Sequence, residues 1–196
     1  FFLERVRSDG EVIPIYIPLA PTDFDGFSER WMGGLLQSFL ASKGLAFPDE
    51  FQSLVKTCRT FIPRTLERMR EAKKHAFQKK TALAFRELLS LTGILREETG
   101  KKILLMLDEF QSLGFLDFAD PFGLFGKEMM IQKDTLYLVS SSAPHKTREI
   151  FHTKLSLLFG NFEVLEVGAL GTEPIQTWVR EEYADLGISD PDLRLL

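Results

Sequence analysis

The chain has 196 residues, enough for one domain with a hydrophobic core or for a core and the start of a second unit. Its composition, 44% hydrophobic and 27% charged, is typical of a globular protein and excludes disordered and fibrous classes. The net charge of −4, from 24 Lys and Arg against 28 Asp and Glu, excludes a global attraction to nucleic acid or anionic lipid.

Cys58 is the only cysteine, so the sequence excludes an internal disulfide framework and a thiolate metal cluster. No apolar segment reaches the roughly 18 to 20 residues of a membrane span, and no signal peptide is recognisable. We therefore expect a cytoplasmic protein without a membrane partner. Because residues 1–6 resemble the end of a helix and residues 192–196 the start of one, we expect an interior piece of a longer protein.

Residues 12–19 predict a first strand, since β-branched and aromatic side chains dominate this segment. The two prolines in it, Pro14 and Pro18, lack an N–H donor and favour the edge of a sheet. Ser28 is expected to cap a helix that runs through Leu40.

A long, largely helical stretch over residues 45–100 precedes the second predicted strand, residues 103–107. This apolar run fits a strand buried on both faces and leads directly into Asp108 and Glu109. Because ligands of open α/β sheets bind beyond the carboxyl ends of the strands, the two acids stand where a ligand is expected. A buried strand followed by an ordinary polar turn is the alternative.

Residues 136–139 predict a third strand that ends in Ser140, Ser141 and Ser142. Small hydroxyl residues at this position can contact a phosphate or the attacking water, although serines also serve as turn and cap residues. Farther on, the pattern predicts a helix over 146–159, a fourth strand over 162–167 and a helix over 174–186 capped by Thr172. Strands that alternate with helices indicate an α/β fold with a parallel sheet.

The order of these segments resembles the nucleotide-binding core of AAA+/STAND-type P-loop ATPases. The matching pieces are the second strand, the Walker B strand, the sensor strand and the stretch before the lid, at residues 12–19, 104–111, 137–142 and 158–170. The resemblance implies a three-layer αβα sandwich with a mostly parallel sheet, in which residues 1–170 form the core and residues 171–196 begin a helical lid.

By this resemblance, Asp108 would bind Mg²⁺ through water, and Glu109 would polarise the hydrolytic water. Ser140 or Ser142 would sense the γ-phosphate of ATP. The resemblance thus implies ATP binding and Mg²⁺-dependent hydrolysis by a switch or motor, and it leaves room for a homo-oligomer. The phosphate-binding loop G-x-x-x-x-G-K-[ST] is absent from the 196 residues. In the family this loop lies upstream of the second strand, so we expect this piece alone to bind nucleotide poorly.

Two further segments leave alternatives open. Residues 64–80 carry seven basic residues against two acidic ones, which predicts either a nucleic-acid footprint or a solvated helical face. Only one aromatic residue, Phe77, stands among them, too few for base stacking, which favours the solvated face. The Phe-rich connector, residues 110–125, is expected to pack against the sheet, with a partner-binding loop as the alternative.

The alternative to an ATPase is therefore an inactive scaffold that binds DNA or protein through the basic helix 64–80 or the Phe-rich connector 110–125. A helicase-like motor is a third hypothesis, because Asp-Glu-Phe-Gln at residues 108–111 has the form of a DExQ box. It is the weakest of the three, since no second set of helicase motifs follows within the chain.

Overall fold

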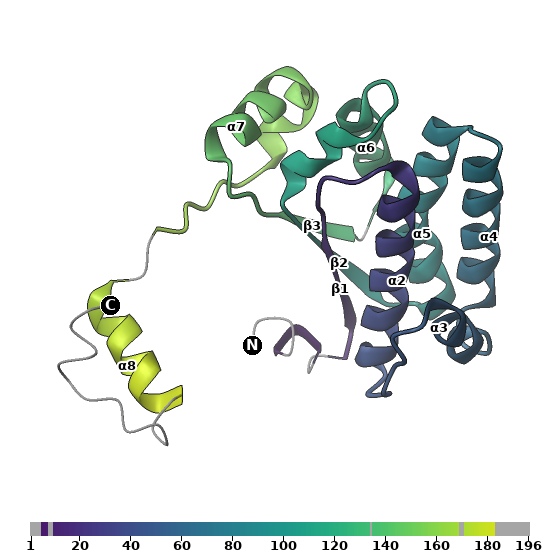
Figure 1. The fold of residues 1–196 in the computed structure, drawn as a ribbon, viewed down its shortest axis with the longest axis horizontal. Coiled ribbons are helices and arrows are strands. Elements are labelled where there is room, and N and C mark those ends of the chain that lie inside the picture. Colours follow the sequence, from purple (N-terminus) through teal and green to yellow (C-terminus); the bar gives the residue numbers. More distant parts are fainter. Residues whose placement is uncertain (1–4, 8–9, 134, 169–170, 183–196) are drawn as a thin grey trace. The chain divides into compact units, whose positions relative to one another are not determined.

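Three parallel strands form an open sheet in the order β1–β2–β3 (Figure 1). The strands are β1 (Val12–Pro18), β2 (Lys102–Asp108) and β3 (Thr135–Val139). The structure is a computed structural model and describes residues 5–7, 10–133, 135–168 and 171–182. The predicted α/β class with a parallel sheet is confirmed.

Strand β1 lies at one edge of the three-stranded sheet and pairs with β2 alone. Its two prolines, Pro14 and Pro18, stand opposite Leu104 and Asp108 of β2. An edge strand tolerates prolines because half of its N–H groups do not enter the ladder. The edge position predicted from these prolines is confirmed for the strands that the structure describes.

Helices make up both connections between the strands. The segment between β1 and β2 contains four of them: α2 (Phe24–Ser42), α3 (Phe51–Cys58), α4 (Pro63–Phe77) and α5 (Thr81–Thr99). The segment between β2 and β3 contains the 3₁₀ helix η1 (Phe110–Phe115) and α6 (Pro121–Ile131). After β3 come α7 (Pro144–Thr153) and the 3₁₀ helix η2 (Ser156–Asn161).

One face of the sheet is covered by helices and forms the core. Its apolar side chains, each at most 1% exposed, are Ile13, Ile15, Ile17, Ile103, Leu105 and Leu107. Helix α2 packs on β1, and α4 packs along α5 (Figure 1). The Trp31 indole N–H donates to the carbonyl of Leu88 at 2.9 Å, which ties α2 to α5 inside the core.

The opposite face is more open. Leu136 and Leu138 of β3 are 68% and 36% exposed on this face, and a shallow groove beside them is lined by Val6 and Leu104. A helical layer over this face, which the three-layer sandwich requires, stays a prediction.

Several predicted boundaries differ from the structure. Helix α2 begins at Phe24, not at Ser28, because the Asp23 carboxylate caps it by accepting from the Gly26 N–H at 2.9 Å. Ser28 instead lies buried inside the helix. The helix predicted over 146–159 ends earlier, at Thr153, and η2 follows.

The chain divides into two compact units, 1–161 and 162–196. The fourth strand predicted over residues 162–167 is wrong, because these residues have no regular secondary structure. Val164, Leu165 and Val167 are exposed there, and an apolar segment without a pairing strand cannot form a ladder. The second unit contains α8 (Thr172–Glu182), which includes Thr172, the predicted cap, and residues 174–182 of the predicted helix. Residues 183–186 of that prediction lie outside the described residues.

The predicted split into a core over 1–170 and a lid over 171–196 stays a prediction. Among the described residues, no helix combines the length and the apolar character needed to cross a membrane.

Candidate active site

The predicted acids and serines meet at the carboxyl edge of the sheet. Asp108 is the last residue of β2, and Ser140 directly follows β3. Two backbone hydrogen bonds join the strand ends: the Ser140 N–H donates to the Leu107 carbonyl at 2.9 Å, and the Phe110 N–H donates to the Ser140 carbonyl at 3.0 Å. Parallel pairing therefore places Ser140 beside Asp108.

Glu109 has a left-handed backbone conformation, with φ 54° and ψ 47°. For a residue with a side chain, this conformation costs about 1–3 kcal/mol, and such residues cluster at functional sites. It marks the sharp change of direction between β2 and η1. Lys79 and Asp120 share this conformation, so it does not by itself distinguish Glu109 from an ordinary turn residue.

The Asp108 carboxylate accepts three hydrogen bonds, all from neutral groups. The Ser140 hydroxyl and the Glu109 N–H donate to Oδ1 at 2.6 and 3.0 Å, and the Tyr16 hydroxyl donates to Oδ2 at 2.9 Å. The Ser140 bond is the largest cause of the lowered pKa of Asp108, and partial burial opposes it. Asp108 is therefore ionised at neutral pH, and donation to it raises the pKa of Tyr16.

Glu109 is held by a separate set of donors. The Ser142 hydroxyl donates to Oε2 at 2.8 Å, and the Gln111 side-chain amide donates to the same oxygen. These two bonds, that of Gln111 first, lower the pKa of Glu109. The two adjacent carboxylates thus stay ionised side by side while neutral donors orient them.

Among the described residues, neither carboxylate has a basic partner. In the part of the chain that the structure describes, no Lys, Arg or His forms an ion pair with Asp108 or Glu109. Nor do the described residues contain a group of three or more His, Cys, Asp or Glu side chains that could hold a metal. Mg²⁺ is commonly bound by one or two carboxylates together with water and substrate phosphates. The two acids could supply the carboxylates of a site of this kind.

Sequence reasoning missed Tyr16. It named Ser141 among the strand-end serines but assigned neither Ser141 nor Gln111 an individual role. Tyr16 lies two residues before the end of β1, on the same face of the sheet as Asp108, which only the strand register reveals. The Ser141 hydroxyl donates to the Gln111 side-chain carbonyl. The run of three serines was the available signal for Ser141.

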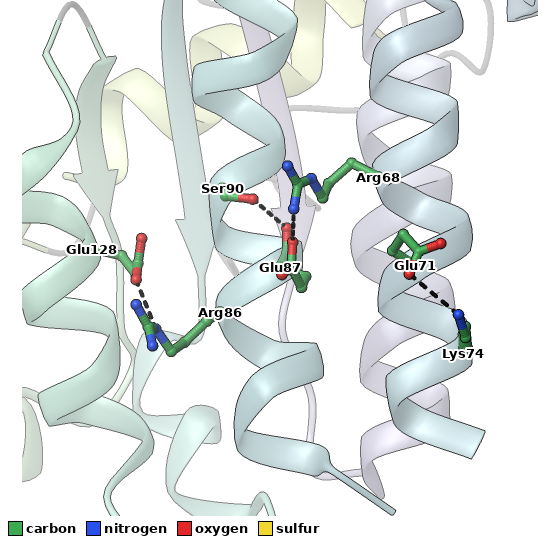
Figure 2. A network of polar contacts seen from close by, with 7 residues as sticks. All are labelled: Arg68, Glu71, Lys74, Arg86, Glu87, Ser90 and Glu128. Atoms are coloured by element: carbon green, nitrogen blue, oxygen red, sulfur yellow. Dashed lines mark hydrogen bonds and ion pairs between the residues drawn. The ribbon is translucent and has the colours of Figure 1, made fainter. Parts of the chain in front are cut away.

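The basic residues of α4 are largely paired within the protein. Arg68 lies 2.7 Å from Glu87 of α5, and Lys74 lies 3.8 Å from Glu71 (Figure 2). The other engaged residues of the segment are Arg64 with Glu97, Arg70 with Glu67, and Lys73 over the ring of Phe51. Acids of α5 thus offset the local charge that the sequence of α4 suggested. This favours the solvated face over a nucleic-acid footprint.

The Phe-rich connector is mainly a packing element, as predicted. Phe110, Phe122 and Phe125 are buried, and the rings of Phe122 and Phe125 lie 5.6 and 5.2 Å from that of Phe110. Phe118 is half-buried, and the ring of Phe115 is exposed under the Lys146 ammonium.

Comparison with protein-family models, with curated proteins and with solved structures found no match to this chain.

Proposed function

We propose that this chain is part of a Mg²⁺-dependent ATPase of the AAA+/STAND P-loop class, with Asp108 and Glu109 as the acidic half of its active site. One observation carries the proposal. Two ionised carboxylates lie at the carboxyl end of the central strand, where hydroxyl groups that follow the neighbouring strand orient them. Within the described part of the chain, neither forms an ion pair with a basic side chain.

The proposed roles follow from the contacts. Mg²⁺ bound with ATP would neutralise charge on the phosphates. Asp108 would hold water molecules around the ion, since its Oδ atoms carry an uncompensated charge. Glu109 would orient the attacking water and accept its proton.

In this proposal, Ser140 and Ser142 orient the two carboxylates, and Ser140 or Ser142 also contacts the γ-phosphate. Each hydroxyl has a single proton, and Ser140 and Ser142 now donate theirs to Asp108 and Glu109. A serine that contacts the γ-phosphate as a donor must therefore release its carboxylate. We expect nucleotide binding to rearrange these two hydrogen bonds.

The 196 residues contain no G-x-x-x-x-G-K-[ST] loop, so under this proposal residues outside them would have to bind the phosphates. The acids by themselves repel phosphates. We therefore expect the 196 residues alone to bind nucleotide poorly, and the tests below use the native full-length protein.

The test measures ATP turnover with Mg²⁺ in the native full-length protein and in Asp108→Asn and Glu109→Gln. General acid–base catalysis contributes about 10² to 10⁴-fold, so we expect at least a hundredfold loss of kcat in Glu109→Gln. Glu11→Gln makes the same chemical change at an exposed position directly before β1. This position is at the amino end of the strands, away from the two acids, so the variant should retain full activity. Turnover that survives in both acid variants would overturn the assignment.

A further inference from the structure

Gln111 connects Glu109 to helix α7 through a line of side-chain hydrogen bonds. Its amide nitrogen donates to Glu109 Oε2, and its carbonyl oxygen accepts from the Ser141 hydroxyl. The Ser141 oxygen in turn accepts from the Thr147 hydroxyl at 2.7 Å and from the Ala143 N–H at 3.1 Å. Ala143 and Thr147 lie at the start of α7.

The direction of every bond in this line is fixed by the carboxylate. An ionised carboxylate can only accept, so the NH₂ group of Gln111 must face Glu109, and its carbonyl must face Ser141. That carbonyl needs a donor, which takes the single hydroxyl proton of Ser141. Thr147 must then donate to Ser141. The order Thr147 to Ser141 to Gln111 to Glu109 is therefore the arrangement in which each donor meets an acceptor.

Packing holds the two ends of the line together. The ring of Phe151 in α7 stacks on that of Phe110 in η1, with centroids 5.9 Å apart and planes 23° apart. Phe110 lies between Glu109 and Gln111 in the sequence and is fully buried. Helix α7 therefore contacts the segment that carries Gln111 through both apolar and polar groups.

We propose that Gln111 is a positioning residue that holds the Glu109 carboxylate in its productive orientation and that Ser141 and Thr147 couple this orientation to α7. The catalytic consequence rests on the proposed function, in which Glu109 orients the attacking water. Gln111 touches neither water nor phosphate in this scheme. Its effect on the reaction passes through Glu109 alone.

The variants separate hydrogen bonding from packing. Gln111→Met keeps the length of the side chain and removes both hydrogen bonds. Gln111→Glu keeps the shape and the acceptor for Ser141 but places a second negative charge against Glu109. Gln52→Met, on the exposed surface of α3, is the matched control.

The experiment measures kcat and KM for ATP in the native full-length protein. Groups that orient an active-site ligand contribute about 10- to 100-fold, so we expect kcat to fall at least tenfold in Gln111→Met and in Gln111→Glu, with KM within about twofold. Ser141→Ala should cause a smaller loss, and Gln52→Met none. In a Glu109→Gln background, Gln111→Met should have no further effect, because the residue acts through Glu109. An unchanged kcat in Gln111→Met or in Gln111→Glu would overturn the proposal.

A measurement without nucleotide separates this proposal from the proposed function. The side-chain amide resonances of Gln111 in a ¹⁵N–¹H spectrum should shift in Ser141→Ala and in Thr147→Val and stay in place in Gln52→Met. If the native protein does not hydrolyse ATP, the proposed function fails, and these shifts decide whether the line of bonds exists. Resonances that do not move in Ser141→Ala would exclude it.

Discussion

At the carboxyl edge of the sheet, Asp108 and Glu109 accept hydrogen bonds from neutral groups, whereas on the α4–α5–α6 surface Glu87 and Glu128 lie beside arginines (Figure 2). Both arrangements orient a carboxylate. Only the second also neutralises it. Arg86 reaches Glu128 at 3.1 Å, so the nearly buried charge on α6 has its counter-ion within the protein.

Under the proposed function, this difference separates the charge that is available for a ligand from the charge that is already paired. A neutral donor stabilises the ionised form of Asp108 and leaves its full negative charge in place. In an ion pair, the two opposite charges compensate each other, and an exposed pair adds little to the stability of the fold. The carboxylates of Asp108 and Glu109 keep their charge, so they support the proposal of a cation site. The basic residues of α4 are mostly paired with acids, so they give weaker support to a nucleic-acid site.

The largest expected difference in stability is between Arg86→Met and Asp108→Asn. Arg86→Met leaves the buried Glu128 carboxylate without its partner, which costs about 1–3 kcal/mol in the free energy of unfolding. Asp108→Asn should change it by less than about 1 kcal/mol. An asparagine can still accept from Ser140 and Glu109 and can donate to the Tyr16 oxygen. Urea unfolding of both variants makes the measurement, and a greater loss in Asp108→Asn would break the comparison.

A pair of neighbouring glycines in α2 tests how firmly the strand below the site is held. A Cβ at Gly34 would lie 3.1 Å from the backbone carbonyl of Tyr16, whereas a Cβ at Gly33 would meet nothing within 4 Å. Overpacking costs about 1–3 kcal/mol, so Gly34→Ala should lower stability and displace Tyr16 from Asp108.

Gly33→Ala is the matched control and should raise stability by up to about 1 kcal/mol, because alanine is the better helix former. Thermal unfolding compares the two variants. Equal stabilisation by both substitutions would show that α2 does not lie so close to β1.

The smallest effect is expected for Arg70→Gln. Both Arg70 and its partner Glu67 are exposed, so removal of the pair should change stability by about 0.5 kcal/mol or less. Urea unfolding at low and at high salt measures this. A loss as large as that in Arg86→Met would mean that exposure does not separate the two kinds of ion pair.

The sequence predicted the strands of the site well, because apolar runs that end in acids or serines define both position and direction. It placed Asp108, Glu109, Ser140 and Ser142 at one edge, and the structure brings them together. Their catalytic roles stay predictions.

The misses have physical causes. Tyr16 escaped notice because the alternation of Ile13, Ile15 and Ile17 gives the face on which Tyr16 lies but not its position along β2. That position depends on the register between the two strands. Residues 162–167 have the composition of a strand, but a strand also needs a partner, which composition does not show. The hydrogen bond from Thr147 to Ser141 depends on the direction of α7 relative to β3, which the sequence does not show.

The central claim is that the unneutralised carboxylates at the end of β2 hold a metal ion that comes with ATP. Its most direct test is the paramagnetic broadening of backbone amide resonances in the native full-length protein with Mn²⁺ and a non-hydrolysable ATP analogue. We predict that Glu109 and Ser140 are broadened in the wild type and stay sharp in Asp108→Asn. Sharp Glu109 and Ser140 resonances in the wild type, with broadening elsewhere, would contradict the account.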